Sequence, residues 1–105
     1  MTSQLRDQLA AAEIRREDGK SGSRYVLAAG GAEAEMTFSR VSPHLVIIDH
    51  TEVPDAFRGT GAGLRLANFA VADAREGGWK IMPLCPFFHA QADRHPEWAD
   101  VIKTR

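Results

Sequence analysis

The sequence is poor in cysteine, and this excludes two classes of site. Cys85 is the single cysteine among the 105 residues. An internal disulfide is therefore impossible, and the paired-cysteine motifs of structural zinc sites are excluded. Because a chain without disulfides is typical of a reducing compartment, we expect a cytoplasmic protein.

Long apolar runs and an excess of one charge are also missing. No apolar run approaches the roughly 20 residues that a membrane span needs, and the N-terminus lacks the apolar core of a signal peptide. The 13 basic and 14 acidic residues leave a formal net charge of −1. This balance provides no basic surface for nucleic acid or for an anionic membrane, so we expect neither as a partner.

The chain has no repeat, no low-complexity tract and no interior linker. With 105 residues, 44% of them hydrophobic, it has the size and composition of one small globular domain. We expect this domain to span residues 13–105. Residues 1–12 are either a helix with Leu5, Leu9 and Ala12 on one face or a loose N-terminal arm.

Four segments have the apolar pattern of strands and are separated by turns that contain glycine or proline. They are residues 25–29, 34–41, 45–53 and 79–84. The third segment is the clearest, because its L-V-I-I run is apolar without alternation, which indicates burial on both faces. A tight turn at Gly30-Gly31 joins the first two segments.

Two further segments have the pattern of helices. Residues 61–77 carry an apolar stripe and end at a glycine pair. The stripe is formed by Leu64, Ala67, Val71 and Ala74, with Ala70 beside it, and Arg65, Asp73 and Glu76 are expected to face away. Pro86 begins a second helix that runs to about Arg94, and residues 97–103 are expected to form a final short turn of helix.

The order of these elements predicts the fold class. The first strands follow one another through short turns and are expected to pair antiparallel. The strand–helix–strand segment that follows requires a crossover, which pairs its two strands in parallel with a right-handed connection. The predicted fold is therefore α+β, a mixed sheet with helices packed on it.

The glycine-rich turn before the main helix is the clearest functional signal. A strand, a turn and a helix in this order place backbone N–H groups at a helix N-terminus, where they can hold a phosphate. A P-loop needs Lys followed by Ser or Thr after its last glycine, whereas Gly63 is followed by Leu64 and Arg65. The dinucleotide fingerprint also fails, because its third small residue would be Leu64 or Leu66. What fits is R-x-x-G-x-G at residues 58–63; the alternative is a tight turn without a ligand.

The chain here resembles the GNAT acetyltransferase superfamily, in which R/Q-x-x-G-x-G/A wraps the pyrophosphate of acetyl-CoA. The motifs H-T-E-V-P at residues 50–54, C-P-F at 85–87 and H-P-E at 95–97 are similar to those of its short, single-domain branch. The resemblance covers about residues 25–102 and implies a GNAT-like sheet that binds acetyl-CoA, or coenzyme A, as a substrate.

The resemblance also implies where the donor lies. The two parallel strands would splay apart at their C-terminal ends, with pantetheine in the gap and the thioester near Glu52, Val53 and Cys85. The residues expected to bind the donor through their backbone and the arginine are Thr51, Val53, Arg58, Gly59, Thr60, Gly61, Ala62 and Gly63. This placement agrees with the rule that ligands bind beyond the carboxyl ends of parallel strands.

Acetylation of an amine needs a base, and two residues are candidates. Glu52 lies at the strand end where related enzymes often carry a carboxylate, and it would act directly or through water. His50 shares a strand face with Glu52, so it would share the base role or orient Glu52. A solvated Glu52 and a structural His50 are the alternatives.

Cys85 is the third catalytic candidate. Pro86 disfavours helical backbone angles at Cys85, which makes Cys85 the expected N-cap of the second helix. A thiol at a helix N-terminus has a stabilised thiolate, so Cys85 would protonate the departing thiolate or accept the acetyl group itself. The alternative is a small buried apolar residue. We expect no metal site, although His89 and His95 follow at short spacing.

The sequence does not identify the acceptor amine. The tight turn between the first two strands leaves no room for the helices that wall the acceptor site in most GNAT enzymes, so an open site is expected. Such a site would take a large acceptor such as a protein, be completed by a homodimer partner, or bind acyl-CoA without transfer. The alternatives to an N-acetyltransferase are therefore a non-catalytic CoA-binding or regulatory module and a small interaction domain.

Overall fold

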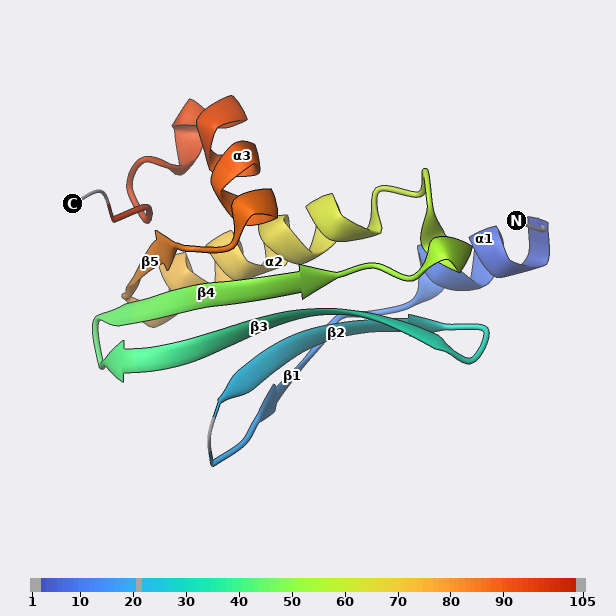
Figure 1. The fold of residues 1–105 in the computed structure, drawn as a ribbon, viewed down its shortest axis with the longest axis horizontal. Helices are drawn as coiled ribbons and strands as arrows, with labels where there is room; N and C mark the ends of the chain where they lie inside the picture. Colours follow the sequence, from blue (N-terminus) through green and yellow to red (C-terminus); the bar gives the residue numbers. More distant parts are fainter. Residues whose placement is uncertain (1–2, 21, 104–105) are drawn as a thin grey trace.

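The computed structural model describes residues 3–20 and 22–103, which form a five-stranded sheet with helices on it (Figure 1). The strands are β1 (Arg15–Asp18), β2 (Ser23–Ala29), β3 (Ala32–Ser42), β4 (Leu45–Glu52) and β5 (Lys80–Pro83). The helices are α1 (Ser3–Ala11), α2 (Ala62–Gly77) and α3 (Pro86–Arg94), with 3-10 turns η1 (Asp55–Phe57) and η2 (Pro96–Trp98).

The sheet is mixed, as predicted. Its strand order is β1-β2-β3-β4-β5. The first four strands pair antiparallel, whereas β4 and β5, which flank the crossover helix α2, pair in parallel. The α+β prediction is therefore confirmed. Figure 1 shows α2 and α3 on one side of the sheet, so the core lies between these helices and the strands.

Strand β1 was not predicted, because its sequence R-R-E-D has no apolar residue. Antiparallel pairing with β2 holds it in the sheet, and exposed ion pairs accompany this pairing. Arg15 contacts Glu17 at 2.7 Å and Glu33 at 3.2 Å, and Arg24 of β2 contacts Glu17 at 2.9 Å. A charged strand at the edge of a sheet also discourages pairing with another chain.

Helix α2 begins and ends where the sequence predicts, but its buried face is rotated. Leu66 is fully buried and Leu64 only partly. The prediction that Arg65 and Asp73 face away is wrong. Arg65 donates to the carbonyls of α1, and Asp73 accepts a hydrogen bond of 2.7 Å from the Tyr25 hydroxyl. Arg65 and Asp73 therefore lie at the edge of the buried face of α2, where their hydrogen-bond partners are.

Tyr25 and Asp73 form a polar link between the sheet and α2. Burial raises the pKa of Tyr25, and its hydrogen bond to the carboxylate of Asp73 adds to the shift. Arg16 of β1 donates to the same Asp73 at 2.9 Å. Because the tyrosine hydroxyl would lack a partner without Asp73, this link fixes α2 against the first two strands.

Helix α1 is docked rather than loose. Leu9 is buried, Leu5 and Ala12 pack against the core, and the guanidinium of Arg65 donates to the carbonyls of Leu9 at 2.7 Å and Ala12 at 2.8 Å. A cation at the last carbonyls of a helix satisfies them and complements the helix dipole. The domain boundary at residue 13 stays a prediction.

The C-terminal segment differs from the predicted turn of helix. Its helical part is the 3-10 turn η2, which precedes most of residues 97–103. Ile81 then donates to the carbonyl of Val101 at 2.7 Å and accepts from Lys103 at the same distance. The segment therefore pairs with β5 and covers part of that edge of the sheet.

Candidate active site

Pairing between β4 and β5 ends before β4 does, and we call the unpaired side of β4 beyond Ile48 the opening. Parallel pairing ends where Ile48 faces Pro83, whereas β4 continues to Glu52. The last backbone link is the hydrogen bond of 2.9 Å from the Cys85 N–H to the Ile48 carbonyl. Pro83 lacks an N–H group and Pro86 starts a helix, so β5 cannot follow β4 further. The end of the pairing thus has a local cause, and a gap wide enough for pantetheine stays a prediction.

A bulge at Asp49 decides which residues of β4 face the opening. Phe38 lies opposite Ile48 and Thr37 opposite His50, which leaves Asp49 as the extra residue. Thr51 then shares a face with the buried Met36, on the helix side of the sheet. Bulges occur often beside active sites, where they redirect side chains. The bulge was not predicted, because it depends on the register with β3.

Cys85 lies against Thr51 across this opening. The Cys85 Sγ and the Thr51 Oγ1 are 3.3 Å apart, and the cysteine is 2% exposed. Cys85 is the N-cap of α3, directly before Pro86, as predicted. Its carbonyl accepts the N–H of His89 at 2.9 Å. A hydroxyl group and the N-terminus of a helix therefore both lie beside the thiol.

His50 and Glu52 lie on the other face of β4. They are exposed, and their cross-strand neighbours are Thr37 and Glu35 on the face opposite the core. Arg24 neutralises Glu35 through a contact of 2.7 Å. The structure thus brings the two base candidates onto one face, as the sequence indicates, but places Cys85 on the opposite face of the strand.

The glycine turn is preformed for an anion. Gly59 and Gly61 have φ of +76° and +79°, which side chains rarely adopt, and a Cβ at either would meet no atom within 4 Å. The Thr60 hydroxyl donates to the Phe57 carbonyl at 2.5 Å and accepts the Ala62 N–H at 3.3 Å. The turn therefore has an open outer surface at the start of α2, where the first N–H groups lack intrahelical acceptors. These features fit a pyrophosphate.

The third glycine of the motif has a different role. A Cβ on Gly63 would lie 2.7 Å from the Cζ atom of Phe87, closer than real Cβ contacts allow. Gly63 therefore lets α2 approach α3 rather than leaving space for a ligand. Arg58 is exposed and forms an ion pair of 2.9 Å with Asp55, so it projects from the turn into solvent.

Two apolar side chains flank the opening. Val53 directly follows β4 and is 37% exposed, and Leu84 follows β5 and is 61% exposed. They are two of the three large apolar residues that the described part of the chain exposes. Leu84 lines the larger hollow described next, whereas Val53, at the end of β4, suits contact with an aliphatic arm such as pantetheine.

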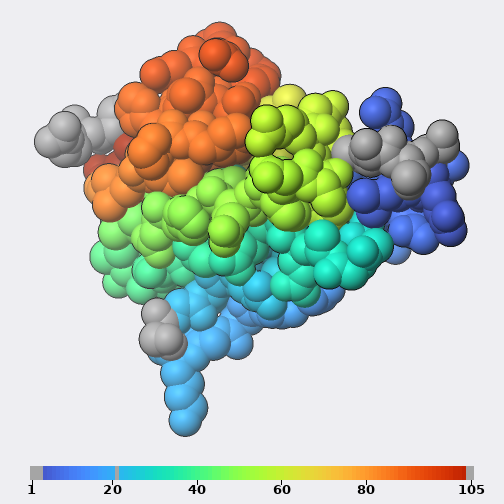
Figure 2. All heavy atoms as spheres, turned by 45° about the vertical axis from the view of Figure 1, so that its right-hand side comes forward, coloured from blue at the N-terminus to red at the C-terminus, as the bar shows by residue number. Residues whose placement is uncertain are grey.

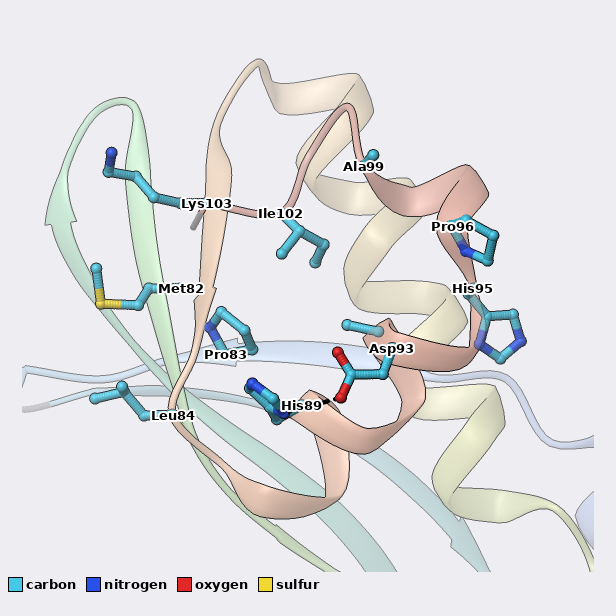
Figure 3. Close-up of a pocket in the computed structure, with 11 residues that line it drawn as sticks. Met82, Pro83, Leu84, His89, Asp93, His95, Pro96, Ala99, Ile102 and Lys103 are labelled. Atoms are coloured by element: carbon cyan, nitrogen blue, oxygen red, sulfur yellow. Dashed lines mark ion pairs between the residues drawn. The ribbon is translucent and has the colours of Figure 1, made fainter. Parts of the chain in front are cut away.

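A larger hollow lies elsewhere, between β5, α3 and the C-terminal segment (Figure 3). It has a volume of about 840 Å³ and contains none of the predicted site residues. In it, His89 pairs with Asp93 at 3.4 Å, while His95 stacks on Trp98. Residues 3–20 and 22–103 contain no group of three or more His, Cys, Asp or Glu that could hold a metal. Within the same ranges, no helix is long and apolar enough to cross a membrane.

Comparison with known proteins supports the resemblance. The model of the family described as GCN5-related N-acetyl-transferase matches residues 24–101. The NMR structure of a "GCN5-like putative N-acetyltransferase" from Staphylococcus aureus is similar, with a TM-score of 0.69 and 28% identity. The match covers 99% of this chain and 93% of the other. The search of curated proteins found no match. This chain belongs to the GCN5-related N-acetyltransferase family.

Proposed function

We propose that the protein is an acetyl-CoA-dependent N-acetyltransferase. The observation that carries this proposal is the glycine turn at the start of α2, which follows the unpaired end of β4 in the chain. The turn has an open surface above Gly59 and Gly61. Strand β4 continues beyond its partner β5, and its Thr51 lies beside the buried thiol of Cys85. Membership of the family supports the same donor.

In this proposal the donor is held mainly by backbone groups, with one arginine at the pyrophosphate. The amides of Gly59, Gly61 and Gly63 and the exposed Arg58 bind the pyrophosphate, since the start of α2 favours an anion. The amides of Thr60 and Ala62 already donate within the turn, to the Phe57 carbonyl and the Thr60 hydroxyl. The backbone of Thr51 and Val53 binds pantetheine as an added strand would. The thioester then lies beside Val53 and Cys85, near Glu52.

The chemistry uses both faces of β4. The amine arrives from the open face, where Glu52, assisted by His50, accepts the proton that the nitrogen loses. Nitrogen bonds to the carbonyl carbon as the carbon–sulfur bond breaks, and the CoA thiolate takes a proton from Cys85. Alternatively, the Cys85 sulfur first displaces the CoA thiol to form an acetyl-cysteine, which the amine then cleaves.

The exposed position of the two base candidates favours a large acceptor, such as a protein or a peptide. His50 and Glu52 lie on an open sheet face, so the amine of a protein or peptide can reach them without entering a pocket. A homodimer partner could complete this face, and a cytoplasmic location provides acetyl-CoA. The second candidate function is a non-catalytic CoA-binding module. It is favoured by the separation of Cys85 from Glu52 by the strand.

The first experiment is a calorimetric titration with CoA, followed by alkylation of Cys85 with iodoacetamide. We expect CoA to bind and to slow the alkylation, because the donor covers the opening beside the thiol. Transfer of acetyl groups to a panel of amines then separates enzyme from binding module. Absence of binding at high micromolar CoA would contradict both functions. Labelling that is indifferent to bound CoA would exclude a role for Cys85.

A further inference from the structure

A pocket lies between helix α1 and the glycine turn. It has a volume of about 410 Å³ and is lined by Arg6, Leu9, Ala10, Gly59, Thr60 and Arg65. Figure 2 shows the blue N-terminal helix on the same side of the molecule as the yellow-green segment that carries the turn. Two residues of the proposed pyrophosphate turn thus form one wall, and an element outside the family match forms the other.

The charged groups at this pocket are positive. The Arg6 side chain is exposed, and the described residues 3–20 and 22–103 provide it with no ion pair. The Arg65 guanidinium is held by the carbonyls of Leu9 and Ala12. Asp7, the neighbour of Arg6 in sequence, does not line the pocket. An arginine without a carboxylate partner beside a phosphate-binding turn is suited to a second phosphate.

The chemistry of coenzyme A places such a phosphate close to the turn. Its pyrophosphate is attached to a ribose that carries the 3′-phosphate and adenine. If the pyrophosphate lies on Gly59–Gly63, the ribose, its 3′-phosphate and the adenine lie next to the pocket, because Gly59 and Thr60 line it. Leu9 and Ala10 provide an apolar wall for the base, and the volume lies within the range of about 300–1,000 Å³ of ligand pockets.

We propose that helix α1 forms the adenosine end of the CoA site and that Arg6 binds the 3′-phosphate. This inference rests on the proposed function, since it takes the pyrophosphate on the glycine turn as its starting point. Arg65 is a positioning residue here, because its hydrogen bonds to the Leu9 and Ala12 carbonyls fix α1 beside the turn.

The test compares two ligands that differ only in the 3′-phosphate, CoA and 3′-dephospho-CoA. Calorimetry is run on the wild type, Arg6→Gln and Lys20→Gln. The last variant removes the same charge from an exposed residue in the β1–β2 turn. We expect the wild type to bind CoA about tenfold more tightly than dephospho-CoA, the usual scale for hydrogen bonds between charged groups. Arg6→Gln should remove this difference by weakening CoA alone, and Lys20→Gln should preserve it.

The outcomes separate this inference from the proposed function. If the wild type binds both ligands equally, or Arg6→Gln weakens both equally or neither, the assignment of Arg6 to the 3′-phosphate is wrong while the donor site stands. If the wild type binds neither ligand, the proposed function fails as well. Arg6→Lys checks geometry: retention of charge with partial recovery of the preference supports a direct phosphate contact. Because Arg6 is exposed, we expect all three variants to fold.

Discussion

The two halves of strand β4 differ in their strand partners and in the burial of their side chains. The first half, residues 45–48, has partners on both sides, and Val46 and Ile48 are fully buried. The second half, residues 49–52, has β3 on one side only, and three of its four side chains are exposed. Within one strand, the first half belongs to the core and the second to the candidate site.

This difference results from neighbouring segments rather than from strand propensity. β5 stops at Pro83 and the chain turns into α3 at Cys85 and Pro86, which removes one partner from β4. The bulge at Asp49 then redirects the following side chains. A strand edge left unpaired by the fold is where an extended ligand can add its own hydrogen bonds.

The largest effect expected from a change in β4 is on stability, in its paired half. Ile48 is 1% exposed and faces the helices, so Ile48→Ala should lower the free energy of unfolding by about 3 kcal/mol. Urea unfolding measures this change, with Ile47→Ala as a partly exposed control from the same half. An equal loss in the control would show that the two positions do not differ in packing.

The next effect is on acetyl transfer, in the unpaired half. Glu52→Gln should lower the rate at saturating acetyl-CoA by about 100-fold, the scale of general base catalysis. Stability should change by less than about 0.5 kcal/mol because the side chain is exposed. Glu35→Gln, its neutralised cross-strand neighbour, is the matched control. A similar loss in both variants would indicate a general acidic field rather than a base.

The smallest effect concerns the contact between Thr51 and Cys85. Thr51→Val keeps the shape of the side chain but removes the hydroxyl 3.3 Å from the sulfur. Losing one hydrogen bond to a thiolate should slow alkylation of Cys85 about fivefold. Rates measured against iodoacetamide check this, with Thr37→Val as a control on the opposite face. An unchanged rate would mean that the hydroxyl does not stabilise the thiolate.

The parts of the fold that could be predicted from the sequence are those with local signals. The apolar run at the start of β4 marks a strand, but the prediction that both of its faces are buried is wrong, since Leu45 and Ile47 are partly exposed. Pro86 places Cys85 at an N-cap, which the structure confirms. The bounds of α2 follow from glycines at both ends. Each of these elements is fixed by residues adjacent to it in the chain.

The parts that were missed depend on distant partners. β1 is a strand because it pairs with β2, where Arg24 and Glu33 lie close to its charges. Arg65 turns toward α1 because the carbonyls of Leu9 and Ala12, more than fifty residues away in sequence, accept hydrogen bonds from its guanidinium. The bulge at Asp49 likewise depends on the register with β3. No helical or strand periodicity encodes these contacts, which explains why the pocket beside α1 was not predicted.

The packing of Gly63 against Phe87 has a consequence for protein engineering and for reading related sequences. A Cβ at residue 63 requires the ring of Phe87 to give way, so the two positions should vary together. A chain with alanine at the first position should carry a smaller side chain at the second. In this protein, Gly63→Ala should be rescued by Phe87→Leu. The last glycine of the R-x-x-G-x-G motif is therefore required by the packing of α2 against α3. A sequence search that demands this glycine selects proteins with the same helix contact.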